Sequence, residues 1–394
     1  MSKTAKAHGM DGTLVEPDWP PLTLHEVRKL LQEYPGQGGP VRILSTSPRP
    51  FSAASVVSTG GGRVFVKRHH RLIRGREGLL EEHRFIEHLR ANGSPSPRVL
   101  ANAAGETALE KDEWTYEVHE APEDADLYEE AISWTPFRSI GHAYSAGRAL
   151  ALLHCASAGY AAPARKVQPL VSSFTIFACD DAQAGMERYL TARPALGGGG
   201  IRDACAEALQ LLEPFHAELK PLLGDLAPLW THNDLHASNL LWSDTSEAAR
   251  ATAVIDFGLA DLTNAVHDVA LAIERNIVEW LVLTRSPASF GAVPVHYEDL
   301  QALLAGYESV RALSGAEAAA LAPMLAVCHA EFALTEADYF LGVRHSREQA
   351  RMAVPDYLAG HARWFRSQSG ERLLDSIRAW AEARTQRGGG ARER

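Results

Sequence analysis

The stretch that decides the fold reads Trp230-Thr231-His232-Asn233-Asp234-Leu235-His236-Ala237-Ser238-Asn239-Leu240-Leu241-Trp242, followed shortly by Ala253-Val254-Ile255-Asp256-Phe257-Gly258. Asp234 and Asn239 lie five residues apart on a loop between two apolar segments, so a carboxylate and an amide can face the same cleft. Asp256 ends a run typical of a β-strand, and Gly258 lets the backbone turn away sharply. The pattern thus places polar side chains at the ends of short apolar runs.

This set of side chains suits phosphoryl transfer from a nucleotide triphosphate. That reaction needs a carboxylate to orient and deprotonate the attacking hydroxyl, and oxygen ligands that hold Mg²⁺ on the phosphates. Asp234 fits the first role, and Asn239 and Asp256 fit the second. The alternative is an ordinary buried loop and a strand that ends in a solvated Asp, but that alternative does not require five residue types at set offsets. We predict an ATP-dependent phosphotransferase.

The same residues resemble the catalytic segment of the aminoglycoside phosphotransferase and homoserine/choline kinase-like family. The resemblance covers about residues 40–280 by motif and implies an α+β, bilobal protein-kinase-like fold. A small antiparallel β-sheet N-lobe with one long helix would precede a larger, mainly helical C-lobe. In that family an Asp at the place of Asp268 supports the catalytic loop by accepting hydrogen bonds from its backbone, although a helix N-terminal carboxylate is an alternative. His232 is expected as a scaffold residue, and His236 is expected near the γ-phosphate.

The N-terminal third supplies the residues expected to bind the phosphates. Arg63-Val64-Phe65-Val66-Lys67 is a β-rich run after a glycine turn, and Lys67 is the candidate for the α- and β-phosphates. The resemblance implies that Glu82 of the next helix holds Lys67, with Glu81 as the fallback. The covering loop, Pro48 to Ala53, lies between expected strands at 41–44 and 54–58; it lacks Gly-x-Gly-x-x-Gly, and Ser52 is its candidate phosphate donor.

The adenine site is expected where the strand Trp114-Thr115-Tyr116-Glu117-Val118 runs into His119-Glu120-Ala121-Pro122. This segment resembles the hinge that reads adenine through backbone N–H and C=O groups. The resemblance implies contacts from the backbone of His119 and Ala121, with Val118 behind the base. A strand followed by proline is otherwise the simple end of a sheet edge.

Composition narrows the class of protein. The chain has 394 residues, 46% of them hydrophobic, which is enough for two lobes, and its net charge of −10 disfavours a nucleic-acid partner. Apolar stretches are interrupted by charge before eighteen residues, and the polar start has no core suited to a secretion signal, so no membrane partner is expected. Four scattered cysteines favour reduced thiols in the cytoplasm.

The expected organisation has four parts. Residues 1–22 form a flexible arm, and residues 23–122 form a nucleotide-binding N-lobe that opens with the capping box Thr23-Leu24-His25-Glu26. Residues 123–385 form the helical C-lobe with the catalytic loop and the acceptor site, and its first long helix is expected at about 135–156. Residues 386–394 form a disordered tail.

The phosphate acceptor is the open part of the prediction. Asn233 replaces the Arg that couples many protein kinases to activation-loop phosphorylation, and no Ala-Pro-Glu segment follows Asp256. We therefore expect a small hydroxyl compound: an amino alcohol, a sugar or an aminoglycoside. Glu274, Glu331 and Tyr339 are candidates for an ammonium pocket. The alternatives are a bacterial stress-response type of protein Ser/Thr kinase and a non-catalytic nucleotide-binding module.

Overall fold

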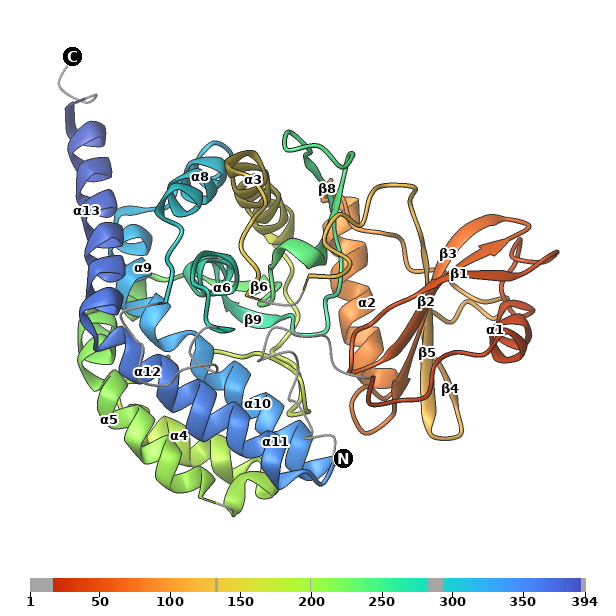
Figure 1. Ribbon diagram of the computed structural model, residues 1–394, viewed down its shortest axis with the longest axis horizontal. Coiled ribbons are helices and arrows are strands. Elements are labelled where there is room, and N and C mark those ends of the chain that lie inside the picture. Colours follow the sequence, from red (N-terminus) through yellow and green to blue (C-terminus); the bar gives the residue numbers. More distant parts are fainter. Residues whose placement is uncertain (1–16, 132–133, 199, 282–292, 391–394) are drawn as a thin grey trace.

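The computed structural model describes residues 17–131, 134–198, 200–281 and 293–390, and they form two lobes joined along one side (Figure 1). The smaller lobe holds a five-stranded antiparallel sheet in the order β1-β2-β3-β5-β4. Its elements are α1 (Leu24–Leu31), β1 (Arg42–Thr46), β2 (Ala53–Thr59), β3 (Gly62–His70), α2 (Arg76–Ala91), β4 (Leu109–Lys111) and β5 (Trp114–Glu120). The predicted α+β bilobal fold is confirmed.

Alternation along β3 separates a core face from a cleft face. Val64 and Val66 are buried in a cluster that also holds Val27 and Leu30 of α1. Because successive side chains of a strand point to opposite faces, Phe65, Lys67 and His69 turn to the other side, toward the larger lobe. The sequence of β3 therefore aims its lysine into the space between the lobes.

The larger lobe is mainly helical (Figure 1). Its α-helices are α3 (Ile140–Ser157), α4 (Ala182–Thr191), α5 (Ile201–Leu219), α6 (Ala265–Ile277), α8 (Tyr297–Glu308), α9 (Gly315–Val327), α10 (His329–Gly342), α11 (Arg347–Arg351), α12 (Ala359–Phe365) and α13 (Gln368–Gly390). Short helical turns are η1 (Pro194–Gly197), η2 (Lys220–Asp225), η3 (Ala237–Asn239) and η5 (Met352–Leu358). One apolar core cluster runs through most of these helices and also takes in Phe85, Ile86 and Leu89 of α2.

Two small β-ladders carry the decisive stretch. β6 (Pro228–Thr231) pairs with β9 (Asp261–Asn264), and β7 (Leu240–Trp242) pairs with β8 (Ala251–Val254). The loop 232–239 connects β6 to β7, and the turn 255–260 connects β8 to β9. Both polar loops are therefore fixed at each end by a ladder that belongs to the same lobe.

The described residues differ from the expectation at three boundaries. The described part of the N-terminal arm is bound in place: Asp18 accepts a 2.7 Å hydrogen bond from Tyr339, and Trp19 stacks on His70. Helix α13 continues to Gly390, past the boundary expected at residue 385; residues 391–394 and 1–16 lie outside the described residues. The first long helix of the larger lobe begins at Ile140, where Ser139 caps it, rather than at 135.

One helical run, Gly315–Gly342, is long and apolar enough to cross a bilayer by length and composition, which the expectation of no such stretch had missed. Within the protein 94% of its most apolar window is buried. The apolar side chains of this run are thus accounted for by their burial in the core of the larger lobe.

Candidate active site

Lys67 and Asp256 meet across the cleft between the lobes. The Lys67 Nζ atom lies 3.1 Å from Oδ1 of Asp256, and both side chains line the cleft. Burial alone would lower the pKa of Lys67, but Asp256 and Glu117 raise it above its usual value. Burial would likewise raise the pKa of Asp256, whereas Lys67 holds it well below its usual range. The two residues are therefore a charged pair at neutral pH.

Asp256 is placed by an uncommon backbone conformation. Its φ angle is +60°, in the left-handed region that non-glycine residues seldom adopt. The N–H of Gly258 returns toward the Asp256 carboxylate at 3.4 Å. This tight turn directs the carboxylate out of the end of β8 and into the cleft.

Asp234 and Asn239 lie together on the loop after β6. Asn239 Nδ2 donates to the backbone oxygen of Asp234 at 2.8 Å and to its carboxylate Oδ2 at 3.2 Å. The other carboxylate oxygen accepts a 3.1 Å bond from Nε of Arg275 in α6. Burial would raise the pKa of Asp234, but His236 and Arg275 lower it below its usual value. Asp234 is therefore ionised and held in one orientation.

The loop that carries Asp234 is fixed from beneath by Asp268. Its carboxylate accepts hydrogen bonds from the backbone N–H groups of His232 at 2.9 Å and Asn233 at 2.8 Å, which is the arrangement expected for it. His154 of α3 binds the same carboxylate at 3.0 Å. Asn233 has a φ angle of +62°, so these two bonds stabilise a strained turn immediately before Asp234.

The two histidines of the loop differ in position. His232 is fully buried, and its Nε2 bonds the Ile255 carbonyl at 2.9 Å, which ties the loop to the strand before Asp256. His236 lines the cleft, and its Nε2 lies 3.7 Å from Oδ2 of Asp234. Burial lowers the pKa of His236. His232 thus holds the backbone, while His236 faces the region where reactants would lie.

The covering loop reaches into the same cleft. Ser52 lines it together with Lys67 and Asp256, as the sequence-based expectation placed it. Arg49, which that reasoning missed, also lines the cleft and is anchored by a 2.7 Å bond to the Ala131 carbonyl. The covering loop therefore adds the cation of Arg49 to that of Lys67 in the cleft.

The hinge differs in part from the expectation. His119 and Ala121 line the nucleotide side of the cleft, but the Ala121 N–H donates to the Arg63 carbonyl at 3.2 Å and is not open to a ligand here. Val118 points to the opposite face of the sheet, into the cluster beneath α1. The alternation of β5 explains this: the residues that face the cleft are Glu117 and His119.

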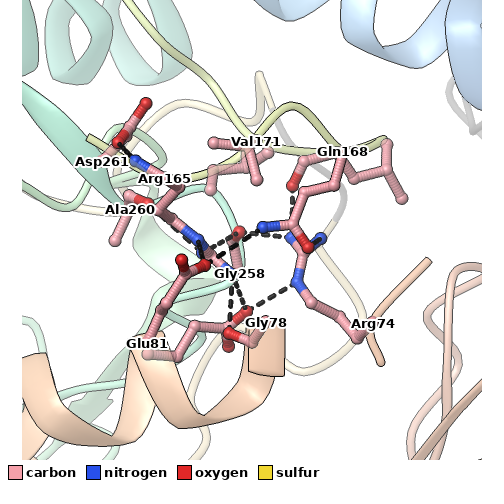
Figure 2. A network of polar contacts seen from close by, with 12 residues as sticks. Arg74, Gly78, Glu81, Arg165, Gln168, Val171, Gly258, Ala260 and Asp261 are labelled. Atoms are coloured by element: carbon pink, nitrogen blue, oxygen red, sulfur yellow. Dashed lines mark hydrogen bonds and ion pairs between the residues drawn. The ribbon is translucent and has the colours of Figure 1, made fainter. Parts of the chain in front are cut away.

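Glu82 does not pair with Lys67. Its Oε1 accepts from Nε of Arg74 at 2.6 Å and from Nη2 of Arg165 at 2.9 Å. Figure 2 shows Arg74 and Arg165 converging on the carbonyl of Gly258, to which both donate. The fallback Glu81 also turns to Arg165, at 3.4 Å. The carboxylates of α2 therefore connect the two lobes through Arg165, and Lys67 pairs with Asp256 instead.

The residues expected to line an ammonium pocket are engaged elsewhere. Glu274 is fully buried and accepts from Trp134 and Tyr357, at 3.0 and 2.8 Å. Glu331 accepts backbone N–H groups of the segment before α4, and Tyr339 binds Asp18. The acidic residue of α10 that lines the cleft is Glu336, beside Phe332 of the same helix and Asp234. Helical spacing alone did not reveal which of the several acids on α10 faces inward.

The family of the chain is shown by its sequence. The model of a phosphotransferase enzyme family, APH, matches residues 49–313. The chain belongs to this family. It is therefore a phosphotransferase, and the kinase-like fold of the APH family explains the two lobes and the shared cleft.

Solved structures of the same fold include several small-molecule kinases. A microcompartment-associated aminopropanol kinase is 20% identical with a TM-score of 0.59, over 90% of this chain and 98% of that one. An amicoumacin kinase is 14% identical with a TM-score of 0.54, over 87% and 94%. The aminoglycoside phosphotransferase of Alicyclobacillus acidocaldarius is 16% identical with a TM-score of 0.50, over 93% and 98%. A search of curated protein sequences gave no match.

Proposed function

We propose that this APH-family enzyme transfers the γ-phosphoryl group of ATP to a hydroxyl of a small compound that carries an amine. The observation that carries the proposal is the convergence of Lys67, Asp234, Asn239 and Asp256 on one cleft. On the acceptor side lies Glu336, whose carboxyl group has no hydrogen-bond partner among the described residues. A nucleotide and an acceptor would then share a single enclosed space.

The nucleotide half of the cleft fits a magnesium-bound triphosphate. Asp256 offers an ionised carboxylate, and Asn239 offers its amide oxygen because its nitrogen is used on Asp234. Lys67, Arg49 and Ser52 supply cations and a hydroxyl for the phosphate oxygens. Mg²⁺ neutralises charge on the transferring phosphates. The amicoumacin kinase of this fold was solved with AMP-PNP and Ca²⁺, which agrees with such a pairing.

Asp234 would act on the acceptor hydroxyl. Its ionised carboxylate accepts the hydroxyl hydrogen bond and aligns the oxygen with the γ-phosphorus. It takes the proton as the new P–O bond forms and the bond from the γ-phosphorus to the β,γ-bridging oxygen breaks, which releases ADP. A carboxylate with a lowered pKa is a weak base, so orientation contributes more than early deprotonation, as a loose transition state allows. Arg275 and Asn239 keep the carboxylate in place for this task.

Glu336 supports an amine on the acceptor. Within the described residues its carboxylate makes no hydrogen bond or ion pair, although the side chain is buried and lines the cleft. Burial raises the pKa of this carboxyl group, so its charged form is costly in the free protein, and a ligand ammonium would stabilise that charged form. Trp134 and Phe332 line the same region, where the guanidinium of Arg275 already lies over both rings, at 5.2 and 3.8 Å from their centroids. The aminopropanol kinase, of the same fold, is named for an amino-alcohol substrate.

The test is an acceptor panel with ATP and Mg²⁺. It compares amino alcohols and aminoglycosides with matched hydroxyl compounds that lack the amine, and with a generic protein substrate, by mass spectrometry of the products. We expect transfer to amine-bearing small molecules and loss of that transfer in Asp234→Asn. Transfer to protein alone would favour the stress-response type of Ser/Thr kinase, and nucleotide binding with no Asp234-dependent transfer to any acceptor would favour a silent module.

A further inference from the structure

Three imidazoles surround one buried carboxylate on the cleft side of the small lobe. Glu117 of β5 is bonded by Nε2 of His69 at 2.8 Å, Nε2 of His83 at 2.9 Å and Nε2 of His119 at 2.8 Å. The histidines come from β3, α2 and β5, so the cluster joins the sheet to its long helix. Neither the phosphoryl transfer described above nor the magnesium ligands use this cluster.

We infer that His83, Glu117 and His119 form a binding site for a transition-metal ion of the Zn²⁺ type. One nitrogen of each imidazole and a carboxylate oxygen all lie within 4.8 Å of one another, which is the grouping that one ion can bridge. Imidazole nitrogens with one carboxylate favour Zn²⁺ or Co²⁺ over Mg²⁺, which prefers oxygen ligands. The site is therefore chemically distinct from the pair Asn239 and Asp256.

The surroundings of the three ligands match those of a metal site. Nδ1 of His83 lies 2.9 Å from Oγ1 of Thr107. A proton on Nδ1 would be donated to that hydroxyl, and Nε2 would then offer its lone pair to an ion. His69 holds the second carboxylate oxygen of Glu117 and would orient it. Such outer partners fix the tautomer and direction of metal ligands.

Access also fits a divalent cation. Glu117 and His119 line the open cleft, which supplies an entry path, whereas His83 is buried behind them. A bound ion would fasten β5 to α2, the helix whose Glu82 reaches the larger lobe.

The competing arrangement is a cluster of histidines that only donate hydrogen bonds to Glu117. The experiment uses the full chain, treated with chelator and titrated with Co²⁺ in excess Mg²⁺ and without nucleotide. We expect one equivalent with visible ligand-field absorption, displacement by Zn²⁺, and a higher Tm in the presence of Zn²⁺. Because no phosphoryl transfer is measured, failure here is separable from failure of the proposed function.

Variants assign the ligands. We expect Thr107→Val to weaken Co²⁺ binding about 10-fold or more, and His119→Gln and His83→Gln to weaken it further. His88→Gln, on the same helix but outside the cluster, and His236→Gln, at Asp234, are expected to bind Co²⁺ like the unmodified chain. Circular dichroism confirms that each variant is folded. Failure of the unmodified chain to take up Co²⁺, or unchanged binding in both His83→Gln and His119→Gln, would overturn the inference in favour of the hydrogen-bonded cluster.

Discussion

Arg165 donates a 2.9 Å hydrogen bond to Glu82, so a residue of the larger lobe holds the carboxylate that was expected beside Lys67. Arg74 donates to the same oxygen at 2.6 Å, and both arginines also reach the Gly258 carbonyl (Figure 2). These contacts tie α2 to the turn that carries Asp256. The position of α2 relative to the turn at Asp256 thus depends on the two buried guanidinium groups of Arg74 and Arg165, which bind the carboxylate of Glu82.

Removal of Arg165 should destabilise the protein. Arg165→Met keeps most of the side-chain length but leaves Glu82 with Arg74 alone in a buried setting. Losing one partner of a buried ion pair typically costs about 3 kcal/mol or more. Urea unfolding should show this loss. The control is Arg202→Met, which breaks an exposed pair with Glu187 and should leave the midpoint unchanged; equal effects of the two variants would contradict the structural role of Arg165.

Asp234→Asn should remove catalysis and preserve nucleotide binding. The amide keeps the shape of the side chain, but it is a poor base for the proton of the acceptor's hydroxyl group. We therefore expect kcat to fall about 10²-fold or more. KM for ATP should change little, because Lys67 and Asp256 are untouched. Steady-state kinetics with the best acceptor from the panel measure both. Asp244→Asn, on an exposed turn between β7 and β8, is the matched control. An unaltered kcat in Asp234→Asn would exclude the proposed role.

The fold and the positions of Lys67 and Asp256 in the cleft were predictable because their signals are local. The alternation in β3 places Lys67, and the turn after Asp256 is encoded by adjacent residues. The capping box at Thr23 and Glu26 forms as expected, with helix α1 from Leu24 to Leu31. Each of these features depends on residues only a few positions apart, so it can be recognised in a single sequence.

Contacts between distant segments were not predictable in the same way. Glu82 is paired by Arg165, 83 positions away, and nothing in the helical pattern of α2 shows which of several cations will reach it. Likewise Glu331 and Glu336 lie on one helix, and only the packing of α10 decides that Glu336 faces the cleft. The contacts of Asp18 could not be predicted from the sequence, because its partners Tyr339 and Arg344 lie more than 300 positions later in the chain.

The segment at Asp18 and Trp19 should behave as a strap across the cleft. The Asp18 N–H donates to the Pro50 carbonyl of the covering loop at 3.0 Å, and its carboxylate accepts from Tyr339 of α10. Tyr339→Phe removes one donor from a partly buried carboxylate, which should cost about 1 kcal/mol. Hydrogen exchange in residues 48–52 should become faster, because the loop loses an anchored neighbour.

The control for the strap is Tyr297→Phe. The hydroxyl of Tyr297 makes no hydrogen bond to the residues that the structure describes. Exchange in residues 48–52 should be the same in this variant as in the unmodified chain. Equal exchange in Tyr339→Phe and the unmodified chain would show that Asp18 does not restrain the covering loop.

Glu336 should make both stability and acceptor binding depend on pH. Burial raises the pKa of Glu336 from 4.5 to about 8, with Arg275 opposing the shift and Asp234 adding to it. Between these values the folded protein keeps a proton that the unfolded chain has released, so this group lowers stability as pH rises from about 4.5 to 8. The unfolding free energy of Glu336→Gln should lack this component, which urea titrations at pH 5, 6.5 and 8, spaced over roughly that interval, would show as a growing difference from the unmodified chain.

Acceptor binding should follow the opposite direction. The ionised carboxylate pairs with an ammonium, so KM for an amine-bearing acceptor should fall as pH rises toward about 8. KM for a matched hydroxyl compound without the amine should change less, which controls for titration elsewhere. In Glu336→Gln the preference for the amine should weaken and its pH dependence should flatten. An amine preference that persists with the same pH profile in Glu336→Gln would place the ammonium site at another carboxylate.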